Sequence, residues 1–197
     1  MAGPKARRQL GPRVPDGRVT PHAPDVMWGI DATSTLTRLG LVSVLFAVDH
    51  CTGEWVGVHV APKGGRRYDA LEVVRQGVRA RFAGFDRDVA KGLSLRHDHG
   101  TQFTSDAFQA ELPFLGVESS PSFVRAPEGN GVAQRFARTM KEHCLWLHAF
   151  DDLEHVRRVL SAWVDLYNEH WLVARHGYRT PAQVRRDLVS AVGGEAA

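Results

Sequence analysis

The chain has little cysteine: only Cys51 and Cys144 occur in 197 residues, far apart and in no C-x-x-C pair. This excludes a disulfide-stapled scaffold and a zinc module built from paired cysteines. We expect both thiols to be reduced and buried. Long apolar runs are also missing, since the longest, residues 39–48, is too short to span a bilayer. The basic N-terminus has no apolar segment of the secretory type, so we expect a cytoplasmic protein without a membrane partner.

What is present is ordinary for a globular protein, with 43% hydrophobic and 24% charged residues. A formal net charge of +3 permits nucleic-acid binding without indicating it. Residues 1–25 contain five prolines and five basic residues against two acids, which predicts a flexible basic arm. We therefore predict an arm over 1–25, one folded core over 26–190 and a disordered tail over 191–197.

Apolar runs of β type and helical periodicities alternate along that core. Strands are expected at 27–33, 41–48, 55–60 and 93–98, with a short edge strand near 117–120. Helices are expected around 71–82, 105–112, 131–147 and 153–167, with a last helix starting at Thr180-Pro181. This order predicts an α/β protein of ribonuclease-H-like fold, with a mixed central sheet of about five strands flanked by helices.

Two of the strands end on an acid. Asp31 follows the first apolar run, and Asp98 follows the run that starts at Leu93. Carboxylates from separate elements that converge on hard divalent cations are what a two-metal phosphoryl-transfer site needs. Asp49 also stands at a strand end, but the Thr52-Gly53 pair after it favours a turn-capping role.

The helix expected from residue 131 carries a polar face beside an apolar one. Gln134, Arg138 and Lys141 follow i, i+4, i+7 spacing on one face. The buried stripe is expected to consist of Ala133, Phe136 or Ala137, Met140, Cys144 and Leu147.

Three segments together resemble a known family. Trp28-x-x-Asp31-x-Thr33, Asp98-x-Gly100-x-Gln102-Phe103 and the run from Asn130 to Phe136 are similar to the integrase catalytic core of insertion-sequence transposases, in the retroviral-integrase superfamily. That family carries two aspartates and a glutamate, with about 35 residues between the last two. Here 35 residues (99–133) separate Asp98 from Gln134, so the spacing matches and the residue type does not.

The resemblance implies DNA cleavage and strand transfer that depend on two Mg²⁺ or Mn²⁺ ions, with Asp31 and Asp98 as metal ligands. It implies a homo-oligomer on transposon ends and target DNA, with Asn130, Arg138 and Lys141 as DNA contacts. Because an amide is neutral and carboxylate oxygens carry charge, Gln134 at the third catalytic position predicts impaired activity and a weakened second ion.

Two other hypotheses stay open. The chain could be a non-catalytic remnant that binds DNA or oligomerises, since nothing before residue 26 resembles the helix-turn-helix region of the family. An unrelated metal nuclease of the same fold would explain Asp31 and Asp98 but not the helix motif. Glu142, about 12 Å further along the helix axis, and Glu128 in the preceding loop are not expected to replace the missing carboxylate. His97 and His99 are expected to point away from Asp98 rather than act in catalysis.

Overall fold

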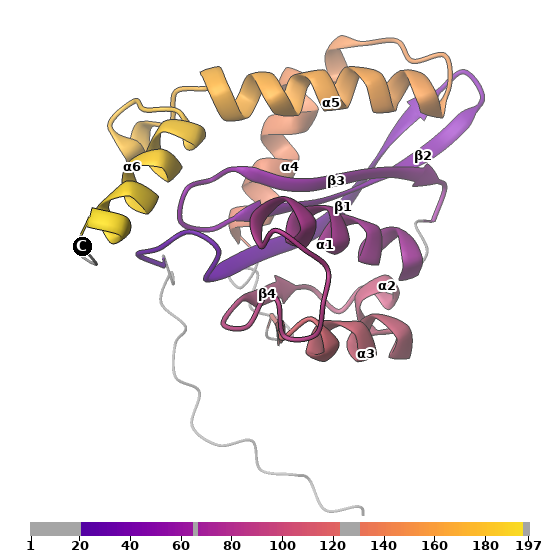
Figure 1. Ribbon diagram of the computed structural model, residues 1–197. Coiled ribbons are helices and arrows are strands. Elements are labelled where there is room, and N and C mark those ends of the chain that lie inside the picture. Colours follow the sequence, from indigo (N-terminus) through magenta and orange to yellow (C-terminus); the bar gives the residue numbers. More distant parts are fainter. Residues whose placement is uncertain (1–20, 65–66, 123–130, 195–197) are drawn as a thin grey trace, which may run out of the picture.

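A computed structural model describes residues 21–64, 67–122 and 131–194, with five strands and six α-helices among them (Figure 1). The strands are β1 (Met27–Thr37), β2 (Gly40–Asp49), β3 (Trp55–Pro62), β4 (Ser94–His97) and β5 (Glu118–Pro121). The α-helices are α1 (Arg67–Arg81), α2 (Thr101–Thr104), α3 (Asp106–Phe114), α4 (Gly131–His143), α5 (Leu153–His170) and α6 (Pro181–Gly194). Two 3₁₀ turns, η2 (Leu145–Leu147) and η3 (Ala174–His176), flank α5.

The five strands form one sheet in the order β3-β2-β1-β4-β5. The first three strands make an antiparallel meander, and β4 and β5 run parallel to β1. The predicted mixed sheet flanked by helices is confirmed. The first strand is longer than predicted because residues 33–37 pair with 40–44 in the hairpin. Asp31 therefore lies in the middle of β1 rather than near its end.

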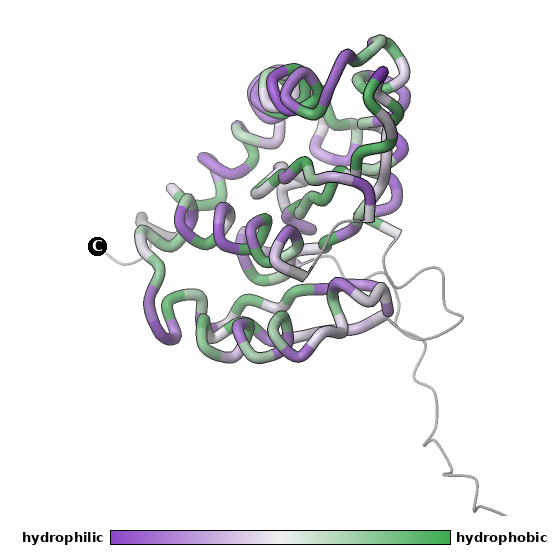
Figure 2. Tube along the Cα trace, turned by 90° about the vertical axis from the view of Figure 1, so that its right-hand side faces the viewer, coloured by the Kyte–Doolittle hydropathy of each residue, from purple (hydrophilic) through white to green (hydrophobic). Residues whose placement is uncertain are grey.

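Each face of the sheet covers its own core, because successive side chains of a strand point to opposite faces. Trp28 and Ile30 of β1 pack in the cluster that includes buried residues of α1 and α3. Phe46 and Trp55 pack in the second cluster, under α4 and α5. The helices in Figure 2 alternate between hydrophilic and hydrophobic segments along the trace, as amphipathic helices do when one face lies on a sheet.

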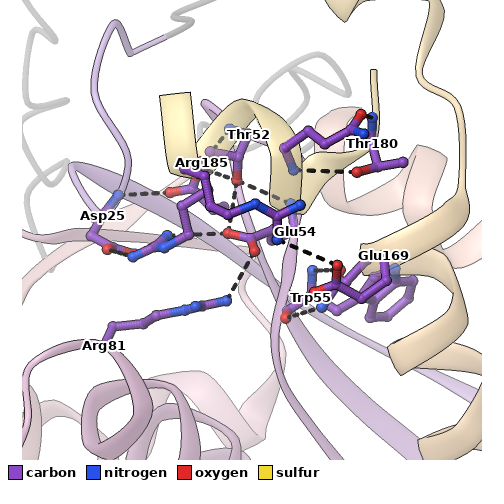
Figure 3. A network of polar contacts seen from close by, with 12 residues as sticks. Asp25, Thr52, Glu54, Trp55, Arg81, Glu169, Thr180 and Arg185 are labelled. Atoms are coloured by element: carbon purple, nitrogen blue, oxygen red, sulfur yellow. Dashed lines mark hydrogen bonds and ion pairs between the residues drawn. The ribbon is translucent and has the colours of Figure 1, made fainter. Parts of the chain in front are cut away.

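The C-terminal helix α6 is tied to the sheet by buried charges (Figure 3). Arg185 of α6 forms ion pairs with Asp25, just before β1, and with Glu54, just before β3. Arg81 at the end of α1 lies 3.4 Å from the other Glu54 oxygen. Asp25 therefore takes part in this network, although it lies within the predicted flexible arm. The helix α6 also includes residues 191–194 of the predicted tail.

The helix start predicted at Thr180-Pro181 is confirmed, and α5 begins after an N-cap at Asp152. The Asp152 carboxylate accepts a hydrogen bond from the backbone N–H of His155 at 2.7 Å. Thr180 Oγ1 accepts from the N–H of Gln183, whose side chain accepts from the N–H of Thr180, which is a capping box.

One member of the predicted buried stripe is wrong. Leu147 is exposed because α4 ends at His143 and the 3₁₀ turn changes the helical phase. Leu145 is buried in its place.

Candidate active site

Asp31 and Asp98 are brought side by side by parallel strand pairing. β1 and β4 pair through Met27 with Ser94 and Gly29 with Arg96, so the same register places Asp98 level with Asp31. Asp31 lies two residues beyond Gly29, and Asp98, directly after the end of β4, lies two residues beyond Arg96. Alternation continued past the end of β4 puts both acids on one face of the sheet, and their charges interact. That face is covered by α4, since a Cβ at Gly29 would lie 3.4 Å from Ala133 Cβ. The fold thus brings the two carboxylates close together, as predicted.

The surroundings of Asp31 favour a positive charge beside it. The pKa of Asp31 is raised to about 6, mainly by burial and in smaller part by the neighbouring Asp98 carboxylate. The backbone N–H of Ala32, which donates to Asp31 Oδ1 at 2.8 Å, and the charge of Lys141 act in the opposite direction. Two adjacent carboxylates, one of them desolvated, are a donor set that suits a hard divalent cation.

Asp98 is held by its own loop. The backbone N–H of Gly100 donates to Asp98 Oδ1 at 2.8 Å. A Cβ at Gly100 would come within 2.6 Å of the Gln102 side chain and 2.9 Å of Asp98 Oδ1, so glycine leaves room for this turn. The short helix α2, which was not predicted, begins directly after it.

His97 supports Asp98 from behind the sheet. As predicted, its side chain points to the opposite face, where it is 1% exposed and packs against Phe103 and Phe108. Its Nδ1 lies 2.7 Å from the carbonyl oxygen of Asp98, and its Nε2 lies 2.9 Å from the hydroxyl of Ser119 on β5. Since a carbonyl only accepts, Nδ1 carries the proton and Nε2 of the neutral ring accepts. His97 thus fixes the backbone at Asp98, a role that its place in the sequence did not reveal.

Gln134 lies in the same pocket as Asp31. This open pocket of about 560 Å³ is lined by Asp31, Ala32, Thr33, Gln134, Ala137, Arg138, Lys141, Glu142 and Trp146. The structure therefore brings together Asp31 and the three α4 positions singled out in the sequence. Asn130, also predicted to contact DNA, lies outside the described residues.

Glu142 and Trp146 line the pocket as well, although neither was predicted at the site. Glu142 accepts a hydrogen bond from Arg138 Nε at 2.7 Å, one helical turn away. The Arg138 charge is therefore balanced within α4, which leaves Lys141 as the cation that acts on Asp31. The i, i+4 spacing of Arg138 and Glu142 was the signal for this pair in the sequence.

Asp49, the rival metal ligand, is occupied elsewhere. Its Oδ1 accepts from the backbone N–H and the hydroxyl of Thr52, at 2.7 and 2.9 Å, and its Oδ2 accepts from the N–H of Asp25. The predicted turn-capping role is confirmed. Asp49 is fully buried, and burial raises the pKa of its carboxyl.

The described residues contain no cluster of three histidine, cysteine or acidic side chains placed to hold a metal ion. Asp31 and Asp98 are two carboxylates, and Gln134 adds one neutral amide oxygen. These side chains suit a divalent cation, but they supply one anionic ligand fewer than three carboxylates would.

Comparison with known proteins now adds to this geometry. The family model of the integrase core domain matches residues 115–181. By this match, residues 115–181 belong to an integrase core domain. The chain is 30% identical over 164 residues to an uncharacterised 31.7 kDa protein of insertion element IS407 from Burkholderia multivorans, covering 83% of this chain and 56% of that protein. It is 25% identical over 172 residues to the IS629 transposase of Shigella sonnei, covering 87% and 55% of the two chains. The chain thus spans little more than half the length of these relatives.

Solved integrase structures have the same fold. The catalytic core domain of HTLV-2 integrase in complex with magnesium aligns with a TM-score of 0.63 at 15% identity, over 83% of this chain and 97% of that one. The core domain of BIV integrase aligns with a TM-score of 0.57 at 17% identity, over 88% and 99%. The ribonuclease-H-like prediction is confirmed by these neighbours. Across residues 21–64, 67–122 and 131–194, no helix is long and apolar enough to cross a membrane.

Proposed function

We propose that this integrase core belongs to an insertion-sequence transposase and acts in the cleavage and transfer of transposon-end DNA. Two observations support the proposal: the β1–β4 register sets Asp98 level with Asp31, and Asp31 lines one pocket together with Gln134. The IS629 and IS2 relatives, which are named transposases, support it.

Asp31 and Asp98 are the proposed ligands of Mg²⁺ or Mn²⁺. The HTLV-2 core domain, solved in complex with magnesium, supports this choice of metal. When bound, such ions activate water or a 3′-hydroxyl and stabilise the leaving oxygen. The protein's part is to hold both carboxylates level, through the β1–β4 pairing and the His97 hydrogen bond to the Asp98 carbonyl. The Ala32 N–H and Lys141 favour the ionised form of Asp31 against the effect of burial.

Gln134 is proposed to weaken the reaction. The charged side chains that line the pocket are two acids, Asp31 and Glu142, and two cations, Arg138 and Lys141. A glutamate at 134 would add an anionic ligand on the first turn of α4, whereas the amide adds none.

Lys141 is proposed to contact DNA phosphates, as is Arg138 once it is released from Glu142. A dimer or trimer on DNA is proposed by analogy with the HTLV-2 core, which was solved in both forms.

A second function is favoured by the same residue. If the amide abolishes catalysis, the chain is a DNA-binding or oligomerising protein that does not cut. Strand transfer of a pre-cut transposon end in Mn²⁺, compared between the parent chain and Gln134→Glu, tests both. Activity of the variant alone supports a silenced catalytic core. Activity of neither, with DNA binding intact, supports the binding protein, and Asp31→Asn in the Gln134→Glu background serves as the inactive control.

A further inference from the structure

One side chain of the active-site pocket has no packing explanation. Trp146 lines the pocket with Asp31 and Gln134, yet it is 68% exposed. Tryptophan carries the largest apolar surface of any side chain and is buried in most folds. The chain itself follows this rule at Trp28 and Trp55, which are 0% and 2% exposed.

The exposure of Trp146 is imposed by its neighbours in the fold. Cys144 and Leu145 are buried under the turn, at 0% and 2% exposure, and the N–H of Leu147 bonds to the carbonyl of Cys144 at 3.2 Å. The turn η2 thus anchors its apolar residues on one side and holds the indole on the other. Among the described residues, Trp146 makes no ring contact, cation–π contact or side-chain hydrogen bond. The backbone of the turn therefore keeps the ring exposed and open to a ligand.

The charges around Trp146 indicate which ligand. Arg138 and Lys141, five to eight residues before it, line the same pocket. A groove that combines cations with an open aromatic ring is the arrangement by which proteins hold unpaired nucleic-acid strands, because the cations follow the phosphates and bases stack on the ring. The pocket volume of about 560 Å³ is within the range of small-ligand sites, about 300–1,000 Å³, and gives room for a single nucleotide.

We propose that Trp146 stacks on an unpaired base of the DNA strand held in the active-site pocket. This inference rests on the proposed function and adds a residue that selects for an open, unpaired DNA end. Stacking needs no particular base, so the contact is expected to be sequence-tolerant. A contact between two copies of this chain is the alternative use of an exposed tryptophan, and the experiment separates the two.

The test is DNA binding in EDTA by the full chain with Trp146 changed to Ala or to Phe. Leu147→Ala is the matched control, because Leu147 is the next residue, is 69% exposed and is not among the residues that line the pocket. The probes are a single-stranded oligonucleotide containing 2-aminopurine and a blunt duplex of the same length. Binding is measured by anisotropy over a series of salt concentrations, stacking by 2-aminopurine quenching, and oligomeric state by sedimentation.

We expect Trp146→Ala to weaken single-strand binding about 5- to 150-fold, the range that one base–aromatic stack provides. The quenching is lost, while the slope of log affinity against log salt stays the same, because no charge is removed. Trp146→Phe keeps most of both signals, and Leu147→Ala changes neither.

Unchanged single-strand affinity in Trp146→Ala overturns the inference while leaving the proposed function intact. A change in sedimentation without a change in quenching assigns Trp146 to a protein contact and also overturns it. Failure of the parent chain to bind either DNA refutes the proposed function and the inference with it.

Discussion

Arg185→Met is expected to destabilise the protein far more than the same change one residue later. Arg185 is 16% exposed in its side chain and pairs with Asp25 and Glu54, which are 15% and 5% exposed. Removing one partner of a buried ion pair leaves a desolvated charge and costs about 3–5 kcal/mol. Arg81 still faces Glu54 but is 3.4 Å away, so it offsets only part of this loss.

Arg186→Met is the matched control. Arg186 and its partner Glu169 are 61% and 53% exposed, and such pairs contribute about 0–1 kcal/mol. Methionine and arginine have similar helix propensities, so the substitution itself does not disturb α6. In thermal unfolding, the Arg185 variant should lose about 6–20 °C and the Arg186 variant less than about 4 °C. Equal Tm values for the two variants would show that the network in Figure 3 does not anchor α6.

Three further predictions concern the site and the thiols. Asp31→Asn should stabilise the metal-free protein at pH 8 by up to about 3 kcal/mol and not at pH 4. The pKa of Asp31 is about 6 in the folded protein against an ordinary value of 3.8, so the parent protein loses stability as the pH rises through 6. Denaturant unfolding at both pH values checks this, and a gain in stability at pH 4 would contradict it. His97→Phe, which keeps an aromatic ring but loses both hydrogen bonds, should weaken Mn²⁺ binding about 10- to 100-fold. His97→Asn, which keeps a donor near the Asp98 carbonyl, should weaken Mn²⁺ binding less. A change in Tm with no change in Mn²⁺ affinity would show that His97 stabilises the fold and does not position Asp98. Cys51 and Cys144 should resist thiol reagents at pH 8 until the protein unfolds, since both are buried and the pKa of each is raised, chiefly by burial, to about 11. Rapid labelling of the native protein would show that the turn after β2 or the end of α4 opens locally.

The sequence predicted the parts of the fold that depend on periodicity. The strands of the meander and the helices α1, α4 and α5 follow from apolar spacing, which burial on a sheet requires. The pairing of β1 with β4 did not follow from periodicity, because its register, which brings Asp98 beside Asp31, joins segments that lie 67 residues apart in the chain (Met27 and Ser94). The length of β1 was also underestimated, because its extension to Thr37 depends on pairing with β2.

The candidate site was predicted only as far as the motif reached. Asp31, Asp98 and Gln134 were found because their motifs resemble a known family, and the pocket brings Asp31 and Gln134 together. Trp146 was missed because an unbroken helix would place Leu147, not Leu145, on the buried stripe. The break after His143 rotates the following residues and turns the indole toward the pocket. Such a break is decided by tertiary packing, which no local pattern records.

Mn²⁺ binding to Gln134→Glu, measured by electron paramagnetic resonance against the parent chain, tests most directly whether Asp31, Asp98 and position 134 form one metal site. We predict that the added carboxylate tightens binding at least about tenfold, because affinity follows the number of charged ligands. Asp31→Asn or Asp98→Asn should abolish this gain. Equal affinity of the variant and the parent, or a gain that survives loss of either aspartate, would show that the three positions do not form one metal site.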